Sequence, residues 1–132
     1  MNASLAMKQY GSVSKEAAVA GADSHHLILL LMKGGLEAIA QAKGALKQNN
    51  IELRGKRITK ATHIILGLKD FLDLDHGGEL AANLDGLYDY MIRALFDAHR
   101  IPSEAKLDEV YGLLNDIASA WAEIAGDAHG AG

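Results

Sequence analysis

Six histidines and seventeen acidic residues are the side chains that could bind a metal, and their spacing decides whether they do. A di-iron site in a helical bundle needs inward-facing glutamates and Glu-x-x-His pairs. The sequence contains no Glu-x-x-His pair, and no two histidines are four residues apart. We therefore expect no metal site and no cofactor.

Other ligand and catalytic motifs are incomplete. The acidic stretch that starts at Asp73 has some features of a calcium loop, but the position of the bidentate glutamate is occupied by Leu84. The pair Gly77-Gly78 is not followed by the Gly-Lys-Ser/Thr ending of a phosphate loop. Serine, histidine and aspartate are scattered without a nucleophile elbow. The sequence thus predicts a protein that is not an enzyme.

Composition argues against further classes of protein. The chain has 132 residues, a net charge of −4 and no cysteine, so it has no disulfides, and the negative charge disfavours nucleic-acid binding. The basic residues Arg54, Lys56, Arg57 and Lys60 are interpreted as a solvated helix face. The longest apolar run, Leu27 to Met32, is too short for a membrane span. Because the N-terminus also lacks a signal-peptide pattern, we expect a cytoplasmic protein without membrane insertion.

Apolar residues recur at helical spacing along most of the chain, which predicts an all-α fold. We expect four long helices of about Ser24–Lys47, Glu52–Leu74, Gly78–His99 and Glu104–Ala125. Asn49-Asn50 and Ile101-Pro102-Ser103 separate neighbouring helices, since Pro102 disfavours helical geometry before it and Ser103 can cap.

Short connections favour an antiparallel four-helix bundle that forms a single domain, residues 1–132. A short N-terminal arm or helix (1–22) precedes the bundle, and a disordered tail (126–132) follows it. The predicted core contains Leu31, Ala38, Ile58, Ile65, Leu84, Met91, Leu114 and Trp121.

The third helix carries more apolar residues than one packing face needs. One stripe, assigned to the core, consists of Leu80, Leu84, Leu87, Met91 and Leu95. A second band beside it consists of Ala81, Tyr88, Ile92 and Phe96. Together the two bands cover about half of the helix circumference, which points to a binding partner.

The start of this helix, with Gly77-Gly78-Glu79, Asn83 and the run Leu87-Tyr88-Asp89-Tyr90-Met91, resembles the signature of the flagellin export chaperones, the FliS family. The resemblance extends to Tyr10 in the N-terminal arm, to residues 22–28 and 41–43, and to residues 107–114 and 120–121. Ser24, Met32 and Lys33 depart from the family's usual residues.

The resemblance implies a cytoplasmic chaperone that binds the disordered C-terminal segment of flagellin. It implies that the chaperone blocks premature polymerisation and presents flagellin to the cytoplasmic domain of the flagellar type III export gate. We expect exposed apolar residues of the first three long helices to form the flagellin grooves, with Asn83 offering hydrogen bonds to peptide backbone. The candidates are Ile28, Met32, Ile64, Leu68, Ala81, Asn83, Tyr88 and Ile92.

The arm is either a disordered tail or has one of two roles. Met7 and Tyr10 share one face if the arm is helical, so the arm could cap a groove of its own bundle or, as the resemblance implies, dock on the export gate. The uncovered apolar band also predicts weak homodimerisation that competes with flagellin. Two other functions remain open: a self-associating structural or regulatory bundle of flagellar assembly, and a bundle enzyme for a small molecule or metal.

Overall fold

The computed structural model describes the backbone of residues 24–131 and the side chains of residues 24–124. This part of the chain forms four helices and contains no strand: α3 (Ser24–Lys47), α4 (Ile51–Asp70), α5 (Gly78–Arg100) and α6 (Glu104–Ala131). The prediction of an all-α four-helix fold is therefore confirmed. Met7 and Tyr10 lie outside the described residues.

Local hydrogen bonds explain two of the helix boundaries. Asn49 adopts a left-handed conformation (φ 56°), and the Asn50 side chain accepts a hydrogen bond from the Leu53 amide at 3.1 Å, so this turn ends α3 and caps α4. At the other corner the Ser103 hydroxyl oxygen accepts from the Lys106 amide at 3.1 Å, at the start of α6. Both corners lie where the sequence predicts them.

The two other boundaries differ from the prediction. α4 ends at Asp70 instead of Leu74, because the Asp73 carboxylate accepts from the His76 amide (3.1 Å) and closes a turn that competes with the helix. α6 continues to Ala131, past Ala125, where we expected the helix to end and a disordered tail to begin. The alanine-rich end of α6 contains no proline that would stop the helix.

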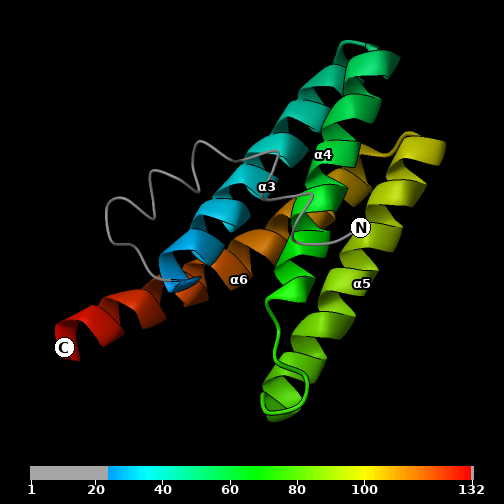
Figure 1. Cartoon of the computed structure of the whole chain (residues 1–132). Helices are drawn as coiled ribbons and strands as arrows, with labels where there is room; N and C mark the ends of the chain where they lie inside the picture. The colour runs from blue at the N-terminus through cyan, green and yellow to red at the C-terminus, as the bar shows by residue number, and fades with distance from the viewer. Residues whose placement is uncertain (1–23, 132) are drawn as a thin grey trace.

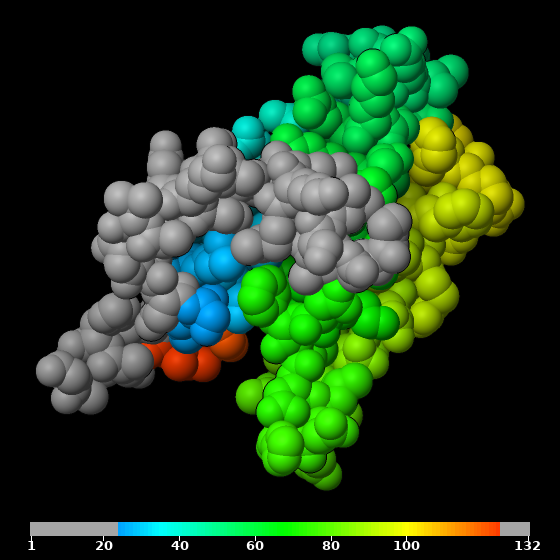
Figure 2. Space-filling model, viewed as in Figure 1, coloured from blue at the N-terminus to red at the C-terminus, as the bar shows by residue number. Residues whose placement is uncertain are grey.

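The helices form a closed ring in which each packs against two neighbours. α3 packs closely against α4 and α6, and α5 packs against the same two helices, whereas the backbones of α3 and α5 lie farther apart. Figure 1 shows α3, α4 and α5 running in alternating directions, with α6 crossing behind them. The segment that joins α4 to α5 projects at one end of the molecule (Figure 2).

A single apolar core fills the ring. Of the predicted core residues Leu84 and Trp121 are partly buried and pack against it, and the others are buried: Leu31, Ala38, Ile58, Ile65, Met91 and Leu114. Gly35 lets the helices approach closely, because a Cβ atom there would lie 3.0 Å from Leu114 Cδ2. The core thus depends on small residues as well as large ones.

The predicted orientation of α5 is wrong in part. Leu80 and Leu87, assigned to the core stripe, are 67% and 37% exposed. The buried face consists of Ala81, Tyr88, Met91, Ala94, Leu95 and Ala98. The helix is therefore rotated towards its second apolar band, because Tyr88 is the larger side chain and alanines at 81, 94 and 98 allow close packing against α4 and α6.

We predict that Leu114→Ala lowers the free energy of unfolding by about 2–5 kcal/mol, because it leaves a cavity at a fully buried position. Urea denaturation measures this loss as a lower midpoint with an unchanged slope. Leu80→Ala is the matched control and should change stability by less than about 0.5 kcal/mol, since Leu80 is exposed. Equal losses for the two variants would show that the faces are assigned wrongly.

Candidate functional site

The bundle has an open groove between α4 and α5, which we call the lateral groove. It comprises two adjoining hollows of about 530 and 220 Å³ that share Thr59 and His99. Its lining comes from α4 and α5 only: Ile51, Glu52, Gly55, Lys56, Ile58, Thr59, Thr62, His63, Ile92, Phe96 and His99. The groove therefore follows the packing line of the two helices.

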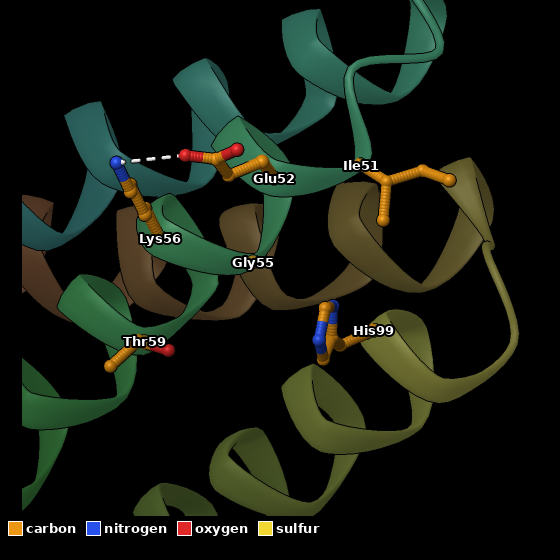
Figure 3. A pocket seen from close by; sticks show the side chains of 6 residues that line it. All are labelled: Ile51, Glu52, Gly55, Lys56, Thr59 and His99. Atoms are coloured by element: carbon orange, nitrogen blue, oxygen red, sulfur yellow. Dashed lines mark ion pairs between the residues drawn. The ribbon is translucent and has the colours of Figure 1, made fainter.

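Small residues of α4 leave room for side chains of α5 at the end of the groove where α4 begins. The His99 ring of α5 faces Gly55, and a Cβ atom at residue 55 would lie 3.0 Å from the ring carbon Cε1 (Figure 3). Thr59 continues the same face of α4 one turn later. Phe96 stands at the rim with 65% of its surface exposed, so the groove offers apolar surface that the described part of the chain leaves open.

A buried arginine fixes the C-terminal end of α5. Arg54 is 6% exposed, and its Nη2 atom donates to the backbone oxygen of His99 at 3.4 Å. A cation here suits the negative end of the helix dipole. The prediction that Arg54 belongs to a solvated basic face is wrong, because the last turn of α5 covers it. In contrast Lys56 is exposed and pairs with Glu52 at 3.2 Å (Figure 3).

An ion cluster joins the same two helices farther along. Lys69 of α4 forms ion pairs with Asp89 and, at 3.5 Å, with Asp85 of α5. The hydrogen bond with Asp89 raises the pKa of Lys69 above its ordinary value, although desolvation opposes the shift. The lateral groove therefore extends along α4 past the Arg54 contact and ends before the Lys69 cluster.

A second cavity, the end pocket, lies where all four helices meet the α4–α5 connection. It has a volume of about 50 Å³ and an apolar lining: Ile28, Met32, Leu68, Phe71, Leu72, Leu84, Tyr88, Ile117 and Trp121. Burial raises the pKa of Tyr88 to about 12, so the phenol stays neutral. The lining thus carries no charge and favours an apolar group.

Trp121 closes one side of the end pocket and is tied to the start of α3. Its indole Nε1 donates to the backbone oxygen of His25 at 2.9 Å. In return His25 Nε2 lies 2.9 Å from the backbone oxygen of Trp121 and, because a carbonyl only accepts, must donate to it. The two rings stack with centroids 4.1 Å apart.

The predicted site residues separate into three groups. Ile28, Met32, Leu68 and Tyr88 meet in the end pocket, and Ile92 lines the lateral groove. Ile64, Ala81 and Asn83 line neither cavity. Their expected exposure is wrong for Met32, Ile64, Leu68, Ala81 and Tyr88, which are buried because α5 is rotated and α3 and α4 face the core. Asn83 is exposed.

Sequence reasoning missed the floor of the lateral groove. Gly55, Thr59 and Thr62 recur at spacings of four and three residues on one side of α4, and that run of small side chains was the available signal. Phe96 was placed in the surplus band but was not chosen as a binding residue. Among the described residues no three histidine, cysteine or acidic side chains gather as a metal site, and none of the described helices is long and apolar enough to cross a membrane.

Known proteins resemble this chain along most of its length. A family model described as "Flagellar protein FliS" matches residues 6–128. The flagellar secretion chaperone FliSB of Pseudomonas aeruginosa is 51% identical over 121 residues, which cover 92% of this chain and 96% of that protein. The flagellar secretion chaperones FliS of Salmonella typhimurium (44% identity, 89% and 88% covered) and Vibrio cholerae (35%, 93% and 90%) are also similar.

The raised pKa of Tyr88 predicts lower stability at alkaline pH. An unfolded tyrosine loses its proton near pH 10, whereas Tyr88 keeps it in the fold until about pH 12. The folded state therefore binds more protons between these values, and stability falls as the pH rises, by up to about 1.4 kcal/mol per pH unit. Urea midpoints measured from pH 9 to pH 11.5 test this loss.

Tyr88→Phe is the control for the alkaline effect. It lacks the titrating group, so its stability should fall less steeply above pH 10. Lys69 adds a loss of the same sign in both proteins, since its raised pKa contributes stability that disappears as the pH rises past 10.5. Parallel pH profiles for the two proteins would rule out Tyr88 as the cause.

Proposed function

The chain belongs to the FliS family of flagellar proteins, and we propose that it acts as a flagellar secretion chaperone that holds the C-terminal segment of flagellin in the cytoplasm before export. In this role the protein binds flagellin, keeps it from polymerising early and delivers it to the type III export gate. It acts by binding and performs no catalysis. The exposed lateral groove, with the apolar side chain of Phe96 at its rim, is the observation that supports this proposal most.

The lateral groove suits an amphipathic segment that folds as it binds. α4 has 20 residues and is about 30 Å long, enough for several turns of a bound helix. Ile92 and Phe96 supply apolar contacts, and the Thr59 hydroxyl can form a hydrogen bond beside them. The Thr62 hydroxyl donates to the Ile58 backbone oxygen at 2.9 Å, so it can only accept a hydrogen bond from a client. A disordered client can wrap a large surface, but it loses conformational entropy when it becomes ordered. Burial of the exposed Phe96 side chain under the client offsets part of that entropy cost.

The end pocket supplies a separate anchoring point. Its apolar lining suits one apolar side chain of the client, and Phe71 and Leu72 are only partly buried at its edge. Four of the residues proposed from sequence line it: Ile28, Met32, Leu68 and Tyr88. We propose that flagellin uses the lateral groove along its length and the end pocket at one position.

Two further contacts belong to this proposal. Met7 and Tyr10 of the arm are the residues proposed to dock on the cytoplasmic domain of the export gate, or to cap a groove until flagellin arrives. A weak homodimer through exposed apolar residues of α5, such as Leu80 and Leu87, is proposed to compete with the client. The alternative function, a structural or regulatory bundle, uses only the second of these contacts.

We predict that Phe96→Asp weakens the binding of a flagellin C-terminal peptide at least about tenfold, which is about 1.4 kcal/mol. The substitution puts a charge on the apolar rim of the groove, yet it should leave the fold intact because Phe96 is largely exposed. Isothermal titration calorimetry measures the affinity, and far-UV circular dichroism checks the helix content.

Tyr111→Asp is the matched control for this prediction. Tyr111 is also an exposed aromatic residue (39%), but it lies on α6 beside α3, across the ring from the lateral groove. Its substitution should change the affinity less than about twofold. Equal effects of the two substitutions would place the client elsewhere, and no binding by the wild type would contradict the proposed function.

A further inference from the structure

The contact between His25 and Trp121 joins parts of the chain that are 96 residues apart. Two hydrogen bonds of 2.9 Å run in opposite directions between side chain and backbone, and the rings stack with an interplanar angle of 10°. We call this pair the α3–α6 bracket. Figure 1 shows the first turns of α3 lying beside the second half of α6, where the bracket is found.

The end pocket is too small for a client side chain while the bracket is closed. Its volume is about 50 Å³, whereas a cavity that accommodates benzene measures about 150 Å³. Buried residues of three helices form its inner walls, among them Met32, Leu68 and Tyr88. Close-packed walls of this kind resist expansion. The pocket can therefore widen only at a wall that is less firmly packed.

The less firmly packed walls are α6 and the α4–α5 connection, whose Phe71 and Leu72 are also partly buried. Of these two walls, α6 is the one that the α3–α6 bracket holds. Trp121 and Ile117 are only partly buried, and the next residues, Ala122, Glu123 and Ile124, are exposed. Beyond Trp121, no described residue of α6 packs into the core. His25 does not line the pocket, yet it holds Trp121 by both of its hydrogen bonds and by ring stacking.

We infer that His25 is a positioning residue that holds Trp121 across the end pocket, and that an apolar side chain of the client enters the pocket only after the α3–α6 bracket opens. The inference rests on the proposed function and adds a closed, autoinhibited state to it. The free protein is then mostly closed, and its observed affinity for the client is lowered by the small fraction that is open.

We expect His25→Ala to combine lower stability with higher affinity for the client. The variant loses the stacking and one hydrogen bond, so it should unfold at a lower temperature. It should nevertheless bind the flagellin C-terminal peptide about 3- to 10-fold more tightly, because the open fraction is larger. His25→Phe keeps a stacked ring but loses the Nε2 hydrogen bond, and its affinity should lie between those of His25→Ala and the wild type.

Ile39→Val provides the control for loss of stability alone. Ile39 is a buried residue of α3 that lines a different hollow, between α3 and α6. Its shortening should lower the unfolding temperature without tightening the binding of the peptide. Lower stability combined with higher affinity would therefore be specific to the bracket.

Trp121 is the only tryptophan of the chain, so its fluorescence reports the bracket directly. A stacked imidazole quenches an indole by contact, and opening should raise the emission intensity when a tryptophan-free flagellin peptide is added to the full-length protein. Free His25→Ala should already be bright and should change little.

The affinity of His25→Ala for the flagellin peptide is the decisive test of the inference. Calorimetry that gives His25→Ala the same affinity as the wild type, or a weaker one, overturns the inference while leaving the proposed function intact. Wild-type protein that does not bind the peptide at all contradicts the proposed function itself.

Discussion

The packing of α4 against α5 is the constraint on which the lateral groove and the exposed face of α5 depend. At one end Arg54 reaches the last turn of α5 and Gly55 leaves room for the ring of His99. Farther along, Lys69 holds Asp85 and Asp89. Between these fixed points α4 presents the small residues Thr59 and Thr62 to α5. A groove remains because the helices are held together by contacts that do not fill the space between them.

The same constraint decides which apolar residues remain for a partner. Because α5 turns Tyr88, Met91, Leu95 and three alanines into the ring, its other large apolar residues lie on the outside of the helix, among them Leu80, Leu87 and Phe96. Phe96 then stands over the lateral groove, whereas Leu80 and Leu87 lie outside both cavities. One helix therefore serves the core and the proposed binding surface with different residues. A substitution on α5 tests binding only if it avoids the buried residues.

Much of the fold could be predicted from the sequence, since it follows from local signals. The apolar periodicity predicted the helices, and Asn50 and Ser103 marked two of their starts. The candidate site was harder, because burial depends on the rotation of each helix, and two adjacent apolar bands on α5 leave that rotation open. Packing against α4 and α6 decides it, as Tyr88 and Leu80 illustrate. The bracket joins His25 to Trp121, which are 96 residues apart in the sequence, so no local pattern could predict it.

The most direct test of the central claim, that flagellin binds along α4 and α5, is hydrogen–deuterium exchange of the full-length protein with and without the flagellin C-terminal peptide. The account predicts slower exchange in residues 51–63 and 92–100, which border the lateral groove, and in residues 71–76 beside the end pocket. Slower exchange confined to residues 39–47 and 104–111, on the opposite side of the ring, would contradict it.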